Sequence, residues 1–344
     1  DFCLSRGLGD VYKRQEQVSG KTVTGFGGGF GAVQVNLAVL YQDAETFDFD
    51  FSNISDDLTV TAYVAVSTTL SPNGDLGPIS EIEVDIDTIL TLSAGQATGR
   101  TINGIGDVTV RGGDPATEYD FSEVNTDGPV LIRYGQSGTL DTDTDFGEPG
   151  QMQIQVDTGV TVTLAAAPPQ QITVVDGGTL VGTAAYLTGA TVTGEGTVEV
   201  TALQATPDAD LSLLTAGIVT ATATVSPNED VFFTGKLGSA AVTVDGVEGS
   251  GYPDTFDVTG ATDEVFSATF TVGAYASLRM TAAQANARDI DGTGKLVVLD
   301  LQADTDLSGV VVGQEGLSSV TATVTSAELD ITDNSNLDPV TEYA

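Results

Sequence analysis

Hydrophobic and polar residues alternate one by one along much of this chain. The alternation is plain at residues 59–66, 219–225 and 320–325, where Thr alternates with Val or Ala over most of each segment. A period of two places every second side chain on the same face, which predicts β-strands that bury one face. Thr and Val are also favoured on pleated surfaces because branching at Cβ costs them little there. These segments therefore predict an all-β chain.

Two further segments refine that prediction. In residues 81–87, acidic and aliphatic residues alternate, so four acids share one face and Ile82, Val84 and Ile86 share the other. This pattern predicts a half-buried strand with a wet acidic face. Residues 282–287 are the one stretch with helical composition. Because a stretch of this length cannot form a stable helix alone, it predicts a bend or a single turn.

A motif that ends in Gly-x-Gly occurs four times. Residues 96–106 and 284–294 align without a gap and share six of eleven residues. Residues 17–27 form a third copy, and residues 186–196 form a weaker fourth copy. A short alternating segment follows each copy. Because glycine has no Cβ and adopts positive φ readily, the motif lets the chain turn sharply before it re-enters a sheet.

A second motif follows each copy of the first and consists of Asp, then Phe or Leu, then Ser. Its four copies begin at Asp50, Asp120, Asp210 and Asp306. A constant order with loops of varying length indicates one duplicated unit. We therefore divide the chain into four repeat modules, the last of them truncated: residues 16–95, 96–185, 186–283 and 284–344.

Two architectures fit modules of this size. A string of β-sandwich domains needs about 100 residues for each domain. An elongated repeat array of the β-solenoid type instead stacks each coil on the preceding one, so that every unit rests on its neighbours. Sharp glycine corners recur every few strands, and no Pro-, Gly- or Ser-rich linker separates the modules. Both observations favour the β-solenoid over tandem sandwiches.

The first fifteen residues differ from the rest. Residues 5–15 resemble the translation of a sequencing adapter, and residues 1–15 contain Cys3 and three of the eleven basic residues. We therefore treat residues 1–15 as not native. The remaining chain starts directly before a motif, which predicts an internal slice of a longer protein.

The composition excludes several functions. The chain has 49 Asp and Glu residues against 11 Lys and Arg residues, a net charge of −38 at pH 7. This charge opposes nucleic-acid binding, which requires a basic surface. The absence of His removes the commonest general base and a usual zinc ligand. No apolar run reaches the length of about 18 residues that a membrane-spanning helix needs. We predict that the chain is not an enzyme.

Acidic residues in one loop are the main candidate for a metal site. Asp141, Asp143 and Asp145 alternate with Thr, and Glu148 follows. Ca²⁺ takes six to eight oxygen ligands, which spaced acids in a loop supply. The pattern departs from the EF-hand loop because Phe146 stands where that loop needs Gly. The four acids are predicted Ca²⁺ ligands, with a solvated acidic loop as the alternative. A weaker cluster comprises Asp330, Asp333, Asn334, Asn336 and Asp338.

The basic residues and the Thr-x-Thr rows suggest two further interpretations. Arg100 and Arg288 occupy equivalent positions in two modules, and Lys21 matches them in charge. A position that recurs in several modules indicates a structural role rather than a unique active site. Rows of Thr on one strand face would also suit a flat ice-binding surface.

The two motifs resemble the repeat regions of very large secreted or cell-surface proteins of aquatic bacteria, of the adhesin-like and biofilm-matrix class. The resemblance implies a structural function, as a stalk or adhesive surface of a secreted or cell-surface protein, stiffened by Ca²⁺. It also implies two kinds of partner, which are neighbouring repeats of the same longer chain and cell-surface or matrix polysaccharide. High acidity and the absence of Cys after residue 15 fit an exported protein in salty surroundings.

Two alternatives stay open. A carbohydrate-active or carbohydrate-binding β-helix would have a cleft lined by non-repeated acids beside a Lys or Arg. A segment of a phage or virion fibre would trimerise and carry a distinct tip domain. The sequence shows neither feature.

Overall fold

The computed structural model of this chain describes most of the region between residues 50 and 323. It describes backbone and side chains for residues 50–53, 60–140, 144–146, 152–168, 171–226, 230–248, 254–263, 267–302, 304–312 and 320–323. It describes the backbone alone for residues 2–3, 11–14, 23–24, 32–36, 59 and 342–343.

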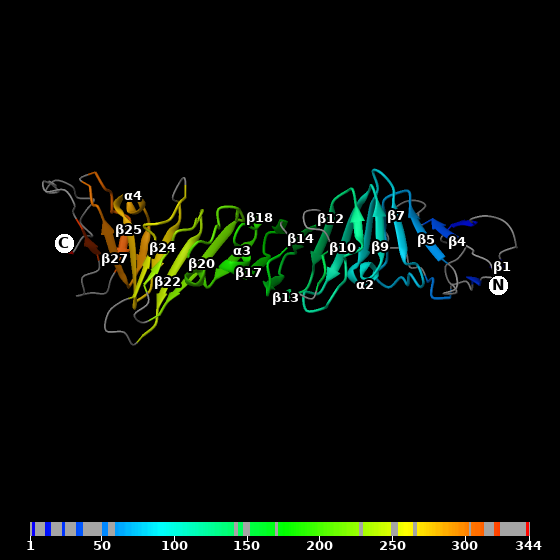
Figure 1. Ribbon diagram of the computed structural model, residues 1–344, viewed down its shortest axis with the longest axis horizontal. Coiled ribbons are helices and arrows are strands. Elements are labelled where there is room, and N and C mark those ends of the chain that lie inside the picture. The colour runs from blue at the N-terminus through cyan, green and yellow to red at the C-terminus, as the bar shows by residue number, and fades with distance from the viewer. Residues whose placement is uncertain are drawn as a thin grey trace. The chain divides into compact units, whose positions relative to one another are not determined.

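Parallel pairing organises the described strands. Every pairing among them is parallel, and each strand pairs with one that lies one turn further along the chain. The length of a turn varies: a short one leads from Thr179 to its partner Thr197, and a long one leads from Ala241 to Thr269. A chain that returns to the same position after each such turn forms a β-solenoid (Figure 1). The prediction of an all-β solenoid is confirmed, and tandem sandwiches are excluded because their sheets are antiparallel.

The chain divides into two compact units, and the first of them, Asp1–Val175, contains two long ladders. One ladder runs in the order β2 (Val11–Arg14), β4 (Ala32–Asn36), β5 (Thr59–Val64), β7 (Glu81–Val84), β9 (Thr101–Gly104) and β11 (Val124–Thr126). The other runs in the order β6 (Thr68–Thr69), β8 (Ile89–Ser93), β10 (Asp107–Gly113), β12 (Val130–Tyr134), β14 (Met152–Val156) and β16 (Gln171–Val174). Two short pairs join β1 (Phe2–Cys3) to β3 (Val23–Thr24), and β13 (Gly138–Leu140) to β15 (Thr161–Leu164).

The second unit, Asp176–Ala344, has the same organisation. Its first ladder contains β17 (Thr179–Thr183), β19 (Thr197–Thr201), β20 (Ile218–Val225), β22 (Ala241–Gly246), β24 (Thr269–Val272), β26 (Ile290–Gly292) and β28 (Val310–Val312). Its second ladder contains β21 (Val231–Phe232), β23 (Asp254–Asp257), β25 (Ala276–Thr281), β27 (Lys295–Leu299), β29 (Val320–Ala322) and β30 (Glu342–Tyr343). The second unit also contains β18 (Thr191–Gly194), whose Val192 forms a bridge with Leu214, and the short 3-10 turn η1 (Leu203–Ala205). Each module predicted from the sequence thus spans several turns, and the module boundaries themselves stay predictions.

Columns of aliphatic side chains fill the interior of each unit. In the first unit, Leu90, Val108, Val130 and Met152 follow one another in register on β8, β10, β12 and β14. None of these four side chains is more than 3% exposed. Each residue contacts the equivalent residue of the next turn, so small and medium-sized side chains suffice to close the interior.

The Gly-x-Gly motif has the same structure in its three described copies. Each copy begins in a single four-residue helical turn: α2 (Ala94–Ala97), α3 (Ala184–Leu187) and α4 (Ala282–Ala285). The side chain of Ser93, Thr183 or Thr281 accepts the N-terminal hydrogen bond of its helix. The prediction of a single turn at residues 282–287 is thereby confirmed.

The motif glutamines hold this helical turn to the preceding coil. Gln96 completes a capping box with Ser93, and its Nε2 atom also donates to the carbonyl oxygens of Ser71 (2.9 Å) and Gly74 (2.8 Å). Gln284 does the same with Thr281 and donates to the carbonyl oxygen of Val258 (2.7 Å). Since Gln96 is buried, these bonds also satisfy carbonyl groups that water does not reach.

Two separate constraints, a positive φ and a lack of space for a Cβ, require glycine at the first position of Gly-x-Gly. Gly104 and Gly292 have φ values of 117° and 129°, a conformation that L-residues rarely adopt. A Cβ at Gly104 would lie 2.1 Å from the carbonyl oxygen of Val84, and one at Gly292 would lie 2.1 Å from that of Val272. The corner predicted from the sequence is therefore real, and it also brings the backbones of two consecutive turns into contact.

The acidic strand is shorter than the sequence predicts. Strand β7 places Ile82 and Val84 inside, but it ends at Val84. Asp87 then adopts a φ of 57°, and Ile86 lies 57% exposed in the connecting turn. The expectation that Ile86 shares the buried face is wrong, because alternation places a side chain only as far as the strand continues.

Candidate functional site

The Asp-x-Ser motif forms the same tight turn in all four copies. The carboxylate of the Asp accepts a hydrogen bond from the backbone N–H of the Ser two residues later. The distances are 2.9 Å at Asp50 and 3.0 Å at Asp120, Asp210 and Asp306. In the first three copies the Ser hydroxyl donates to the same oxygen, at 2.5 to 2.6 Å. Such bonds to a carboxylate are short and strong, so the side chain of the Asp fixes the backbone of the turn.

The middle residue of each copy anchors the turn in the core. Phe51, Phe121, Leu211 and Leu307 are at most 1% exposed. The motif therefore combines an apolar anchor inside the solenoid with a hydrogen-bonded carboxylate at its surface. This division of roles explains why the middle position is always Phe or Leu.

These hydrogen bonds also set the ionisation of the aspartates. At Asp50, Asp120 and Asp210 the serine hydroxyl is the main cause of a pKa below the usual value, because its hydrogen bond favours the charged form. At Asp306 the backbone N–H of Ser308 is the main cause of a lowered pKa. A lowered pKa stabilises the folded chain above the pKa of the unfolded chain, and this contribution disappears as the pH falls through the folded pKa.

We expect a pH-dependent effect from replacing Ser52, Ser122 and Ser212, three motif serines whose hydroxyls donate to the motif aspartates, with Ala. The triple variant should melt at a lower temperature than the unchanged chain at pH 6. The difference should shrink as the pH falls below about 4, where the unfolded aspartates protonate. Thermal melts of both proteins between pH 2.5 and 7 measure it. A difference that stays constant over this range would contradict the assigned role.

Three of the motif aspartates form a parallel bridge with a charged residue of the next coil. In the first unit, Asp50 forms a parallel bridge with Asp75, and Asp120 forms one with Asp145. In the second unit, the residue bridged to Asp210 is Lys236. The first unit thus places like charges one turn apart, which is unfavourable, whereas the second unit places opposite charges there. The Lys236 Nζ atom lies 3.2 Å from Asp210.

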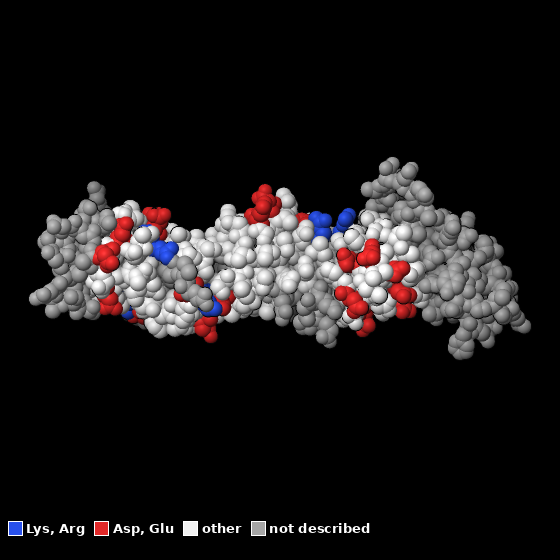
Figure 2. Space-filling model, turned by 90° about the horizontal axis from the view of Figure 1, so that it is seen from above, with Lys and Arg blue, Asp and Glu red and all other residues white. Residues whose placement is uncertain are grey.

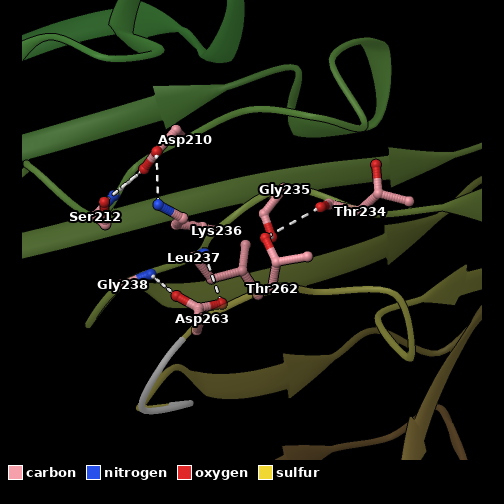
Figure 3. Close-up of polar contacts among 9 residues, drawn as sticks. All are labelled: Asp210, Ser212, Thr234, Gly235, Lys236, Leu237, Gly238, Thr262 and Asp263. Atoms are coloured by element: carbon pink, nitrogen blue, oxygen red, sulfur yellow. Dashed lines mark hydrogen bonds and ion pairs between the residues drawn. The ribbon is translucent and has the colours of Figure 1, made fainter.

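Lys236 replaces the motif Asp, and a residue of the next turn supplies the missing carboxylate. Leu237 is fully buried like the anchor residues of the other copies. Asp263 accepts from the backbone N–H groups of Leu237 (3.1 Å) and Gly238 (2.8 Å) (Figure 3). The adjacent Thr262 hydroxyl donates to the carbonyl oxygen of Gly235 (3.3 Å). Asp263 therefore fixes the tight turn at Lys236, although Asp263 itself belongs to the next coil of the solenoid.

Replacing Asp263 with Ala is expected to lower the free energy of unfolding by about 2 kcal/mol, because two N–H groups lose a charged acceptor. Asp263→Asn keeps one acceptor oxygen and should lose about half of that. Lys236→Met should cost less than about 1 kcal/mol, because its ion pair is half exposed. Chemical denaturation measures all three, with Asp208→Ala, at an exposed position of the preceding turn, as the matched control. An Asp263→Ala loss no larger than that control would refute the assignment.

Of the four predicted Ca²⁺ ligands, the structure describes only Asp145. Asp145 is exposed, and its backbone pairs with the turn at Asp120, where its carbonyl oxygen accepts from the N–H of Phe121 (2.7 Å). The fold therefore adds Asp120 to this acidic neighbourhood, which the sequence pattern did not indicate. Asp141, Asp143, Glu148 and the cluster at residues 330–338 lie outside the described residues. Among the residues that the structure describes, no group of three or more acids is arranged for a metal ion.

Ca²⁺ binding at residues 141–148 stays a prediction. If it occurs, EGTA should lower the melting temperature of the chain, because removing a ligand bound only by the folded state removes its stabilisation. A triple variant with Asn at Asp141, Asp143 and Asp145 should show no such shift. Identical melting curves with and without EGTA would remove the hypothesis.

The basic residues join consecutive turns. Arg133 pairs with Asp157 (2.9 Å) and Arg279 with Asp257 (3.3 Å), each across one turn. Arg100, the recurring cation of the first motif, donates through Nε to the carbonyl oxygen of Ile79 in the preceding turn (2.8 Å). The structural role predicted for Arg100 fits this contact. Lys21 lies outside the described residues.

Comparison with protein-family models, with curated proteins and with solved structures finds no match to this chain. Among the described residues, no helix is long and apolar enough to cross a membrane.

Neutral hydrogen-bond donors on the strands next to the acidic strand β7 bind acids of residues 81–87. The Tyr63 hydroxyl donates to Asp85 (2.7 Å), and the Asn103 side chain donates to Glu81 (3.2 Å). Both donors lie one turn away from their acceptors. On the face that Figure 2 shows, clusters of acidic residues outnumber the basic residues. At these two contacts, neutral donors join consecutive coils and leave the negative charge of the acids in place.

Proposed function

We propose that this chain is a structural repeat segment of a larger extracellular or cell-surface protein, where it forms part of a stalk or of an adhesive matrix. The observation that carries this proposal is the use of polar side chains between turns. The motif aspartates fix turns, the glutamines and Arg100 bind carbonyl groups of the preceding coil, and three ion pairs link neighbouring coils. Groups of this kind resist separation of the coils, as a mechanical element requires.

The acidic surface and the amino-acid composition support the proposed extracellular or cell-surface location. A strongly acidic chain with no Cys after residue 15 needs no disulfide-forming pathway for that region, and salt screens its self-repulsion. In this function, neighbouring repeats of the longer chain continue the stacking, and cell-surface or matrix polysaccharide is the external partner. Ca²⁺ at residues 141–148 would stiffen the first unit.

Single-molecule stretching of the chain between its ends tests the proposal. A solenoid that resists load should unwind in several steps, because each turn contacts only its neighbours. One released turn adds roughly 60–100 Å when its residues are fully extended. We expect length increments in that range or multiples of it. A single release of the whole chain at very low force would contradict a mechanical role.

A second measurement separates this function from the catalytic alternative. The purified chain is incubated with acidic and neutral polysaccharides, and reducing ends and unsaturated products are followed. We expect no product above that of a heat-unfolded sample. Turnover of any of these polymers would overturn the structural proposal in favour of a β-helix enzyme.

A further inference from the structure

The outer face of strands β20, β22 and β24 in the second unit differs from the rest of this acidic chain. Its nine outward positions contain six threonines: Thr220, Thr222, Thr224, Thr243, Thr269 and Thr271. The other three are Ile218, Ala241 and Asp245. One acid among nine positions, and no base, makes this face nearly neutral in a chain of net charge −38. We call it the threonine face.

The threonines of this face are in register across the strands. Thr222 pairs with Thr243, and Thr243 pairs with Thr271, so one column of threonines crosses all three strands. Thr220, Ala241 and Thr269 form the adjacent column. Paired strands lie about 4.8 Å apart, and successive outward residues of one strand lie about 6.6 Å apart. The face therefore presents a two-dimensional lattice of hydroxyl and methyl groups, and Figure 1 shows its three strands side by side.

The hydroxyl groups of the central column are available to an external partner. Within the described part of the chain, the side chains of Thr222, Thr243 and Thr271 make no hydrogen bond to another residue. Thr271 is exposed, and Thr222 and Thr243 are half-buried by their neighbours. Branching at Cβ also restricts each side chain to few rotamers. Ordering these groups against a partner thus costs little conformational entropy.

The chemistry of the face selects the partner. It has no aromatic ring for stacking against a sugar, and none of the Tyr, Trp, Met or Arg that enrich protein interfaces. Its near neutrality offers nothing to a polycation or polyanion. Acids border it on both sides, because Glu199 pairs with Thr220 and Asp291 pairs with Thr271. A neutral lattice of hydroxyls and methyls matches a partner that is itself a neutral lattice of hydroxyl groups.

We propose that the threonine face binds the surface of ice. The oxygen atoms of hexagonal ice repeat at distances close to the two spacings of the face. Threonine hydroxyls hold ordered water in that pattern, and the methyl groups between them exclude disordered water. This inference goes beyond the structural function and does not depend on it, because a stalk needs no such face.

Ice-affinity partition and inhibition of ice recrystallisation test the proposal with the full chain. We expect the unchanged chain to enter slowly grown ice and to keep ice crystals small, relative to an equal concentration of albumin. The double variant Thr222→Lys with Thr243→Lys should lose at least tenfold in potency, since a long cation in the central column breaks the lattice. The matched control, Thr61→Lys with Thr101→Lys, makes the same change on the outer face of β5 and β9 and should keep full potency.

Two controls distinguish a loss of ice binding from misfolding of the variants. Circular dichroism must show the same strand content in all variants. Since Thr222 and Thr243 are half-buried, a second variant changes the exposed Thr269 and Thr271 to Lys and should show the same loss. The proposal is overturned if the unchanged chain behaves like albumin, or if the folded variants of the threonine face remain as potent as the control. Either result leaves the mechanical function untouched.

Discussion

Replacing Gly104 with Ala is expected to lower the free energy of unfolding of the first unit by about 3–5 kcal/mol. The new methyl group would lie 2.1 Å from the carbonyl oxygen of Val84, which belongs to the backbone and cannot rotate away. The residue also has a φ of 117°, which a Cβ disfavours. The equivalent change at Gly292 should have the same effect on the second unit. Urea denaturation followed by circular dichroism measures both.

Two other glycines of the same region are the matched controls. Gly95 lies in α2, and no atom lies within 4 Å of the position that its Cβ would take, so Gly95→Ala should be neutral or stabilise by up to about 1 kcal/mol. Gly99 has a φ of 65° but no atom near the position that a methyl group would take, so Gly99→Ala should cost only about 1–2 kcal/mol. Losses of similar size at Gly95, Gly99 and Gly104 would show that close contact between turns is not what selects glycine.

Phe121→Ala is expected to cost about 3–5 kcal/mol, the usual range for removing a fully buried Phe ring. The ring of Phe121 is 0% exposed, stacks on Tyr119 at a centroid distance of 5.5 Å and lies 6.4 Å from the ring of Phe146. The change would therefore remove the anchor of one Asp-x-Ser turn and open a cavity beside the neighbouring turn.

The control for that change is Phe121→Leu, which imitates the copies at Leu211 and Leu307. It should cost less than about 2 kcal/mol, because it keeps most of the buried volume. Hydrogen exchange should show the faster opening of Phe121→Ala in the turns next to residue 121 before it reaches distant turns. An equal loss for Ala and Leu would mean that the aromatic contacts, rather than the filled volume, anchor this turn.

The sequence predicted the repeated elements of this fold well, because their causes are local. Alternation of Thr and Val marks strands, Gly-x-Gly marks a corner that admits no Cβ, and an Ala-rich stretch of a few residues forms a single helical turn. The same reasoning failed at Ile86, where the strand ended before the alternation did. A pattern of side chains does not reveal where the backbone leaves the ladder.

The contacts between turns were not predictable in the same way. Asp263 and Lys236 belong to one site, but they lie in different turns, and their separation in the sequence depends on the length of the turn between them. Turn lengths vary along the solenoid, so no fixed spacing connects a residue with its partner in the next coil. One signal was present in the sequence. A Lys followed by Leu and Gly stands at residues 236–238, where the motif position would otherwise hold an acid.

At Lys236 the carboxylate that fixes the tight turn comes from Asp263 in the next coil, and this dependence affects how such an array can grow by gene duplication. A duplication that ends between these two codons would copy a cation without its distant carboxylate, and the daughter coil would start with two unfilled amide groups. A duplication that includes both codons would copy a working pair. In this part of the gene, the smallest segment that keeps the pair together is therefore two coils long, whereas an Asp-x-Ser turn has its carboxylate and its donor within three consecutive residues.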